Sequence, residues 1–101
     1  MKKVCVALIA GLFSYGAVAA GDPEAGKAKA GVCAACHGPA GKASIPGYPH
    51  IAGQNKEYLA NALKAFRSGE RKGGFAALMS PMAAPLSDQD IEDLAAYFST
   101  L

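Results

Sequence analysis

The stretch Cys33-Ala34-Ala35-Cys36-His37 constrains this chain more than any other part of it. Two cysteines separated by two residues and followed directly by histidine are typical of covalent attachment of c-type haem. The two thiols add across the haem vinyl groups as thioethers, and the short spacing places both sulfurs along one porphyrin edge. His37 then faces the iron as a neutral imidazole ligand, and its other ring nitrogen needs a partner that fixes the ring. The motif therefore predicts one haem c, bound through Cys33 and Cys36.

Three other interpretations of the cysteine pair are weaker. A thioredoxin-like redox pair needs a βαβ pattern around it, and no strand-like alternation flanks these residues. Half of a structural zinc site needs two further ligands, and outside the N-terminal segment the chain offers only His50. A disulfide between Cys33 and Cys36 would close so short a loop that it would stabilise the fold little.

Residues 1–19 are predicted to be a cleaved signal peptide. Lys2 and Lys3 give a positive start, the run that follows is predominantly apolar, and Ala17-Val18-Ala19 offers the small residues that signal peptidase recognises. We therefore expect export to the periplasm and one haem-binding domain over residues 20–101. A retained membrane anchor is less favoured, because glycine and polar residues interrupt the apolar run, so no stable membrane insertion is expected after cleavage.

The charge balance changes when the signal peptide is removed. The full chain has ten Lys plus Arg against eight Asp plus Glu. Without Lys2 and Lys3 the count is eight against eight, so the domain is formally neutral and no attraction to nucleic acid follows. A domain of about 82 residues is close to the size at which an apolar core alone is marginal. A buried haem would supply the missing apolar centre.

The segment from Gly21 to Ala35 is predicted to form a first helix. Asp22 can cap its start, and Pro23 suits the first helical position. Gly26 and Ala30 lie four residues apart and share a face, where small side chains let another helix approach closely. The alternative is that both are ordinary surface positions in an alanine-rich helix.

A second helix is predicted over residues 56–68, between a cap at Asn55 and a stop at Gly69. One side of this helix is apolar and should be buried; it comprises Tyr58, Leu59, Ala62, Leu63 and Phe66. Basic residues on the other side and just beyond form either a docking patch for an acidic partner or a solvated helix face. These are Lys56, Lys64, Arg67, Arg71 and Lys72.

A third helix is predicted to begin at Ser87, where Ser87-Asp88-Gln89-Asp90 resembles a capping box with Asp in place of Glu. Its apolar residues recur at helical spacing and form one stripe: Ile91, Leu94, Ala95, Phe98 and Leu101. We expect this stripe to cross the first helix at Gly26 and Ala30. Three helices without a strand predict an all-α fold.

Residues 38–54 are rich in Gly and Pro and lack helical or strand periodicity, as expected of a loop that wraps a prosthetic group. A carbonyl from its rigid part would accept a hydrogen bond from the free N–H of His37, and Pro46 is the preferred candidate. Tyr48 and Ile51 are expected to line the haem pocket.

Residues 69–86 are predicted to be a second irregular segment, whose chemistry lies in Met79 and Met82. A thioether is a soft, neutral iron ligand that completes six-coordination opposite histidine and raises the reduction potential. From the residues alone the two methionines compete evenly, and a buried methionine is often only core filler. His50 is a weaker candidate ligand, because a loop histidine is more often an exposed polar residue.

The mature chain resembles a class I cytochrome c, and most of all a single domain of the cytochrome c4 type, with relatives among small c553-like cytochromes. The residues that carry the resemblance are 21–26, 33–38, 48–54, Met79 with 85–88, and 95–98. The resemblance implies the small class I cytochrome c fold, with three main helices and loops wrapped around one covalently bound haem. It also implies Met79 as the second iron ligand, because the axial methionine of that family stands eight residues before the serine that opens the last helix.

The function implied is that of a periplasmic one-electron carrier with His/Met-ligated iron, rather than an enzyme. Such a carrier docks transiently with redox protein donors and acceptors. One alternative is a haem subunit of a larger respiratory dehydrogenase or oxidase complex. Another is a catalytic or gas-binding haem protein, against which the two methionines argue. Cytochrome c4 proteins carry two such domains, whereas this sequence holds one motif, so it could act alone or pair with a second haem protein.

Overall fold

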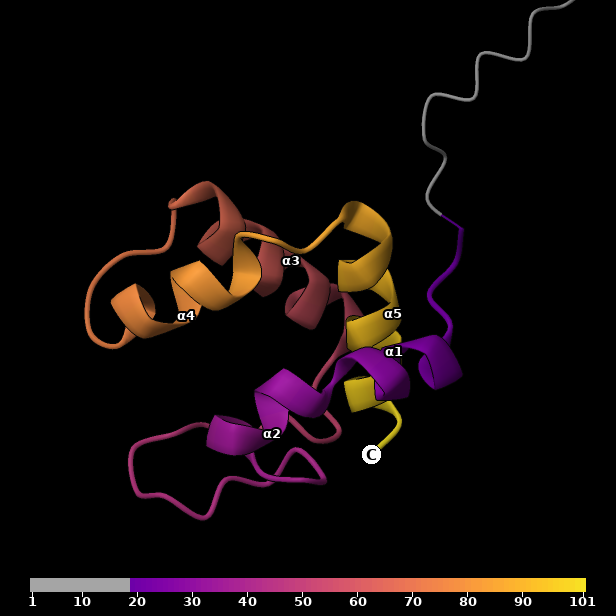
Figure 1. The fold of residues 1–101 in the computed structure, drawn as a ribbon, viewed down its shortest axis with the longest axis horizontal. Coiled ribbons are helices and arrows are strands. Elements are labelled where there is room, and N and C mark those ends of the chain that lie inside the picture. Colours follow the sequence, from indigo (N-terminus) through magenta and orange to yellow (C-terminus); the bar gives the residue numbers. More distant parts are fainter. Residues whose placement is uncertain (1–18) are drawn as a thin grey trace, which may run out of the picture.

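The computed structural model describes residues 19–101, which form five α-helices (Figure 1). In chain order these are α1 Pro23–Lys29, α2 Gly31–His37, α3 Lys56–Ser68, α4 Ala76–Ala83 and α5 Asp88–Ser99. This part of the chain contains no strand, so the all-α prediction is confirmed. Residues 1–18 of the predicted signal peptide lie outside the described residues. Within residues 19–101 no helix is both long and apolar enough to cross a membrane.

The first predicted helix is in fact two helices. The N–H of Ala30 donates to the carbonyl of Lys27 at 3.3 Å, a tighter turn than the α-helix makes, and α2 begins anew at Gly31. Ala30 is buried in the main core, whereas Gly31 has low helix propensity. The prediction of one continuous helix over residues 21–35 was wrong because core packing at Ala30 is not visible in local sequence. After this break, α2 carries the cysteine pair and His37.

α3 has the boundaries that the sequence predicts. Asn55 Oδ1 accepts from the N–H of Tyr58 at 3.0 Å, and Gly69 ends the helix with a φ of +79°. On the apolar side Leu59 is buried, but Tyr58 is 50% exposed. The prediction that this whole side is buried was therefore only partly right. α3 packs against α4 and α5.

α4 lies inside the segment that was predicted to be irregular. Pro81 stands within this helix and lacks the N–H that would donate to the carbonyl of Ala77. The prediction of an irregular segment was wrong here, because a proline late in so short a helix removes one hydrogen bond without preventing the first turns. Met79 and Met82 are three residues apart in α4 and therefore share a face.

α5 begins as predicted. Ser87 Oγ accepts from the N–H of Asp90 at 3.0 Å, and the Asp90 carboxylate accepts from the N–H of Ser87 at 3.0 Å, which completes a capping box. The predicted stripe forms the centre of the core through Ile91, Leu94, Ala95 and Phe98. Leu101 lies beyond the helix and is 44% exposed, so the prediction that it belongs to the apolar stripe of this helix was wrong.

α1 crosses α5 at Gly26, but it meets the edge beside the apolar stripe rather than the stripe itself. A Cβ atom at Gly26 would overlap the carbonyl oxygen of Asp93 and lie 2.7 Å from the Cβ of Tyr97. The small residue at this position is therefore required by the helix crossing, as predicted. Ala30 does pack with the stripe, in the same core cluster.

Asp93 is a buried carboxylate at this crossing, with 3% of its surface exposed. It accepts hydrogen bonds from the backbone N–H of Asp22 at 2.9 Å, from Gln89 Nε2 at 2.9 Å and from Lys29 Nζ at 2.6 Å. These donors, the backbone N–H of Asp22 foremost, lower the pKa of Asp93 from 3.8 to about 2. The carboxylate thus stays ionised and ties α1 to α5.

Candidate haem site

A cavity of about 590 Å³ lies between α2, α3, α4 and α5. The loop that joins α2 to α3 and the loop that joins α3 to α4 also line it. In the view of Figure 1, α4 lies above α2, and residues of both helices line this cavity. The whole predicted apolar side of α3 lines it as well, together with Leu94, Ala95 and Phe98 of α5. The walls are therefore mostly apolar, which suits a flat and largely apolar prosthetic group.

The cysteine motif lies on one side of this cavity. Within α2, Cys36 and His37 follow Cys33 by three and four residues, so all three side chains share one helix face, and all three line the cavity. Burial, with a smaller effect from Cys36, raises the pKa of the Cys33 thiol. Neither cysteine is in a disulfide. Within residues 19–101 no three His, Cys, Asp or Glu residues come together as a metal site.

The His37 ring is held by a backbone carbonyl. Its Nδ1 lies 2.9 Å from the carbonyl oxygen of Pro49. A carbonyl can only accept, so Nδ1 carries the proton and donates it, and the lone pair of Nε2 is left for a metal. The chemistry of this ring therefore fits an iron ligand whose orientation is fixed from behind.

The prediction that Pro46 supplies this carbonyl was wrong. Pro46 is the second residue of a turn in which the N–H of Tyr48 donates to the carbonyl of Ile45 at 3.2 Å. Gly47, the third residue of that turn, has a φ of +90°, the pattern of a type II turn. Pro46 thus shapes the loop but does not line the cavity, and Pro49, three residues later, reaches His37.

Tyr48 and Ile51, which are predicted to line a haem pocket, both line this cavity. The Tyr48 ring also stacks on Phe75, with centroids 6.2 Å apart and planes 15° from parallel. This contact joins the loop after α2 to the residue that precedes α4. Phe75 was missed by the sequence analysis, because it belongs to no periodic pattern and two glycines precede it.

Both candidate methionines line the cavity from α4. Met79 is half-buried, whereas Met82 is 44% exposed. His50 lines the cavity too, but its Nδ1 accepts a hydrogen bond from the backbone N–H of Ala43 at 2.8 Å. One ring nitrogen of His50 is therefore already used within the loop.

Among residues 19–101, the charged residues that line the cavity, apart from its histidines, are Arg71 and Lys72, and no carboxylate of this part of the chain lines it. The Arg71 guanidinium carbon lies 4.6 Å from the centre of the Phe66 ring, a cation–π contact that helps to fix the side chain. A positive edge on an otherwise apolar cavity matches haem, whose ring is apolar and whose two propionates are anionic. The residues present therefore fit a covalently attached haem.

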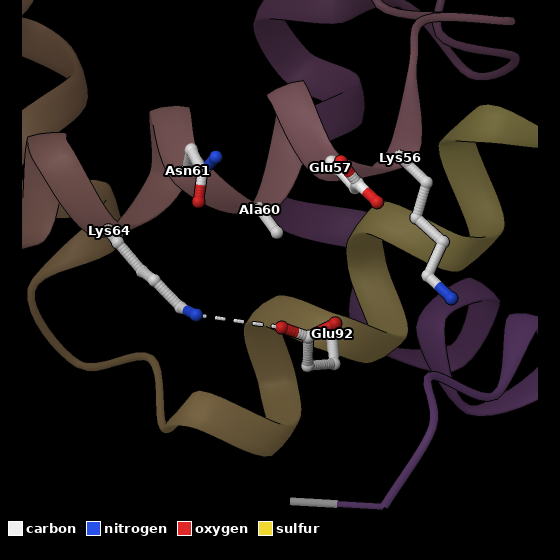
Figure 2. Close-up of a pocket in the computed structure, with 6 residues that line it drawn as sticks. All are labelled: Lys56, Glu57, Ala60, Asn61, Lys64 and Glu92. Carbon is white, nitrogen blue, oxygen red and sulfur yellow. Dashed lines mark ion pairs between the residues drawn. The ribbon is translucent and has the colours of Figure 1, made fainter.

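A second, smaller groove lies between α3 and α5 and has a volume of about 280 Å³ (Figure 2). It is lined by Lys56, Glu57, Ala60, Asn61, Lys64 and Glu92. Figure 2 shows Lys64 reaching toward Glu92, with the nitrogen and oxygen 3.6 Å apart. Cations and anions alternate here, so this groove is not a basic surface.

The basic residues of the predicted docking patch are therefore divided between different environments. Lys56 and Lys64 line the groove between α3 and α5, and Arg71 and Lys72 line the large cavity. Arg67 is paired with Asp88 at 2.6 Å. A solvated, locally paired helix face describes α3 better than a single docking patch does.

Comparisons with known proteins agree on one family. A family model described as cytochrome c matches residues 23–101. The chain is 56% identical over 81 residues to cytochrome c-554(548) of Halomonas halodenitrificans, covering 80% of this chain and 98% of that protein. It is 41% identical over 69 residues to a thiosulfate dehydrogenase electron acceptor of Stutzerimonas stutzeri, covering 68% of this chain and 32% of that protein.

A solved structure of a cytochrome c is also similar to this chain. The reduced recombinant cytochrome c4 from Pseudomonas stutzeri matches with a TM-score of 0.70 and 46% identity, over 79% of this chain and 45% of that chain. The chain spans about half the length of the curated relatives named cytochrome c4 that it matches.

Proposed function

This chain belongs to the cytochrome c family, and from that premise we propose that it is a periplasmic one-electron carrier with His37 and Met79 as the ligands of its haem iron. Members of the family bind haem c covalently through a cysteine pair, here Cys33 and Cys36. The observation that carries the proposal is that both cysteines, the histidine with its available Nε2 and the two methionines line one apolar cavity.

The choice of Met79 over Met82 has two supports. Met79 is the less exposed of the two methionine side chains that line the cavity from α4. It also stands eight residues before Ser87, the spacing that the resemblance to cytochrome c4 domains implies. Met82, one turn later on the same face, is the competing ligand.

Haem iron supplies the redox chemistry of such a site, because it takes up and releases one electron. The protein's own residues determine how well it does so. The apolar walls from α3 and α5 exclude water, and the Pro49 carbonyl fixes the His37 ring. If His37 and a methionine both held the iron, no position would be left for a substrate, which favours electron transfer over catalysis.

The partners proposed are redox proteins that dock transiently. The relative named as an electron acceptor of thiosulfate dehydrogenase supports a dehydrogenase as the electron donor. A neutral domain with locally paired charges suits a weak and reversible contact.

The second candidate is a haem subunit of a larger complex. It is favoured by the relatives named cytochrome c4, in which a stretch matching this chain makes up only about half of a longer protein. Elution with a larger partner during purification from the periplasm would favour the subunit, whereas elution alone at the size of this chain would favour the free carrier.

An absorption experiment tests the function itself. Spectra of the purified protein are recorded oxidised, reduced, and reduced under carbon monoxide. We expect a sharp α-band on reduction, the weak long-wavelength band of a methionine–iron bond on oxidation, and no change with carbon monoxide. A carbon monoxide shift without the methionine band would mean an open iron and would replace electron transfer with catalysis or gas sensing.

A further inference from the structure

We propose that His50 is a positioning residue for the iron ligand His37, acting through the carbonyl of Pro49. This inference rests on the proposed function, in which His37 Nε2 binds the iron. It assigns His50 a role within the loop instead of the role of a second iron ligand. Three observations lead to it: how the loop is closed, what links its two arms, and which peptide unit holds the His37 ring.

The loop is closed at its base by Gly41. The Gly41 carbonyl accepts from the N–H groups of Ile51 at 2.8 Å and Ala52 at 3.0 Å. Gly41 has a φ of +72°, and a Cβ atom there would lie 3.0 Å from the nitrogen of Ala52, so glycine is needed for this close approach. Residues 42–50 therefore form an excursion from a fixed base, and Pro49 extends from it to His37.

His50 links the two arms of that excursion. The N–H of Ala43, on the outgoing arm, donates to His50 Nδ1 on the returning arm at 2.8 Å. The other hydrogen bond formed between residues of 42–50 is the turn bond from Tyr48 to Ile45, which lies at the tip. An N–H donor requires Nδ1 of His50 to be unprotonated, so its ring proton is on Nε2.

Pro49 and His50 share the peptide unit on which His37 depends. The Pro49 carbonyl is coplanar with the nitrogen and Cα of His50, because the peptide bond is planar. Anchoring the His50 side chain to Ala43 therefore restrains the direction in which that carbonyl points. The same carbonyl is 2.9 Å from Nδ1 of His37.

The consequence reaches the iron through the imidazole. A firm hydrogen bond from Nδ1–H to a carbonyl fixes the ring and makes the imidazole a stronger donor to the metal. A stronger donor stabilises ferric over ferrous iron, so loosening the carbonyl should raise the reduction potential. His50 would thus affect the electron carrier without touching its iron.

The experiment compares three variants of the haem-loaded protein. His50→Asn places its side-chain oxygen where Nδ1 lies and keeps the acceptor; His50→Leu removes it at similar size; His50→Gln keeps polarity but carries its amide one bond farther out. Exchange of the His37 Nδ1 proton with solvent is measured by NMR, alongside the reduction potential. We expect exchange about fivefold faster in His50→Leu and His50→Gln, as loss of one net hydrogen bond predicts, with a higher potential. His50→Asn should remain close to the wild type in both.

Two results would overturn the proposal: exchange and potential unchanged in His50→Leu and His50→Gln, or equal shifts in all three variants. If His50→Leu does not fold, His50→Gln carries the comparison with His50→Asn. Failure of the proposed function is seen separately, since the wild-type protein would then lack the methionine–iron band. With that band intact and proton exchange unaltered, only the role of His50 fails.

Discussion

Asp93 illustrates how much one side chain contributes to the fold. Its carboxylate accepts from the backbone of Asp22 and from the side chains of Lys29 and Gln89, and so connects the start of α1, the end of α1 and α5. A buried carboxylate is favourable only when its hydrogen bonds are made, and here they are. Removing the charge should therefore affect stability far from the haem site.

For Asp93→Asn we expect the free energy of unfolding at neutral pH to fall by about 1–3 kcal/mol. The pKa of Asp93 is lowered from 3.8 to about 2 in the folded protein, so its contribution is present above pH 3.8 and is lost as the pH falls toward 2. Denaturant unfolding of both proteins at several pH values should show their difference shrinking over that window. The pKa of Asp90 is also lowered, but Asp90 is present in both proteins, so its own titration contributes to the stability of both. A difference independent of pH would contradict the assignment.

Arg71 should influence the haem through its charge. In Arg71→Gln the cavity loses a cation that would face the haem propionates, so ferric iron gains relative stability and the reduction potential falls. A unit charge beside such a site is worth on the order of 1 kcal/mol, which is about 40 mV for one electron. Lys56→Gln, in the groove between α3 and α5, is the matched control. Equal shifts of potential in the two variants would contradict a specific role for Arg71.

At the scale of helices, the crossing of α1 and α5 depends on the absence of a side chain. Gly26→Ala places a methyl group against the Asp93 carbonyl, so we expect a loss of at least about 2 kcal/mol in the free energy of unfolding. Gly31→Ala is the control, because nothing lies within 4 Å of its added Cβ and α2 is helical there. It should be neutral or stabilising by up to about 1 kcal/mol. Guanidinium unfolding of both haem-loaded variants makes the comparison, and equal losses would disprove close packing at Gly26.

Helix ends that depend on neighbouring residues were predictable from sequence. Asn55, Gly69 and the Ser87–Asp90 pair lie where their local chemistry predicts, because a cap needs only residues within one turn. The break at Ala30 and the helix around Pro81 were not predictable, because tertiary packing outweighs local propensity there.

The same division applies to the site. The spacing of the cysteine motif predicts Cys33, Cys36 and His37 as site residues, and side-chain chemistry predicts the two methionines; all five line the cavity. The carbonyl that holds His37 could not be read from sequence, because every residue offers a carbonyl and the folded course of the loop brings that of Pro49, not that of Pro46, to the ring. Asp93 gave no signal of burial, since its partners lie on two helices.

At the scale of the whole molecule, the fold brings the helices that carry the proposed ligands, α2 and α4, to one apolar cavity, while α5 packs against α1 and α3. A carrier of this kind needs a closed iron and a rigid ligand set, and both follow if Met79 binds opposite His37. Under the proposed function, Met79 is thus the residue on which electron transfer depends.

The proposal that Met79 is the second iron ligand is tested most directly by the methionine–iron absorption band of the oxidised protein. The band is compared in the wild type, Met79→Ala and Met82→Ala. The band should be present in the wild type and in Met82→Ala. It should vanish in Met79→Ala, with a lower reduction potential and new binding of carbon monoxide to the reduced protein. A band that survives in Met79→Ala and vanishes in Met82→Ala would transfer the ligand to Met82, and its absence from the wild type would contradict His/Met ligation altogether.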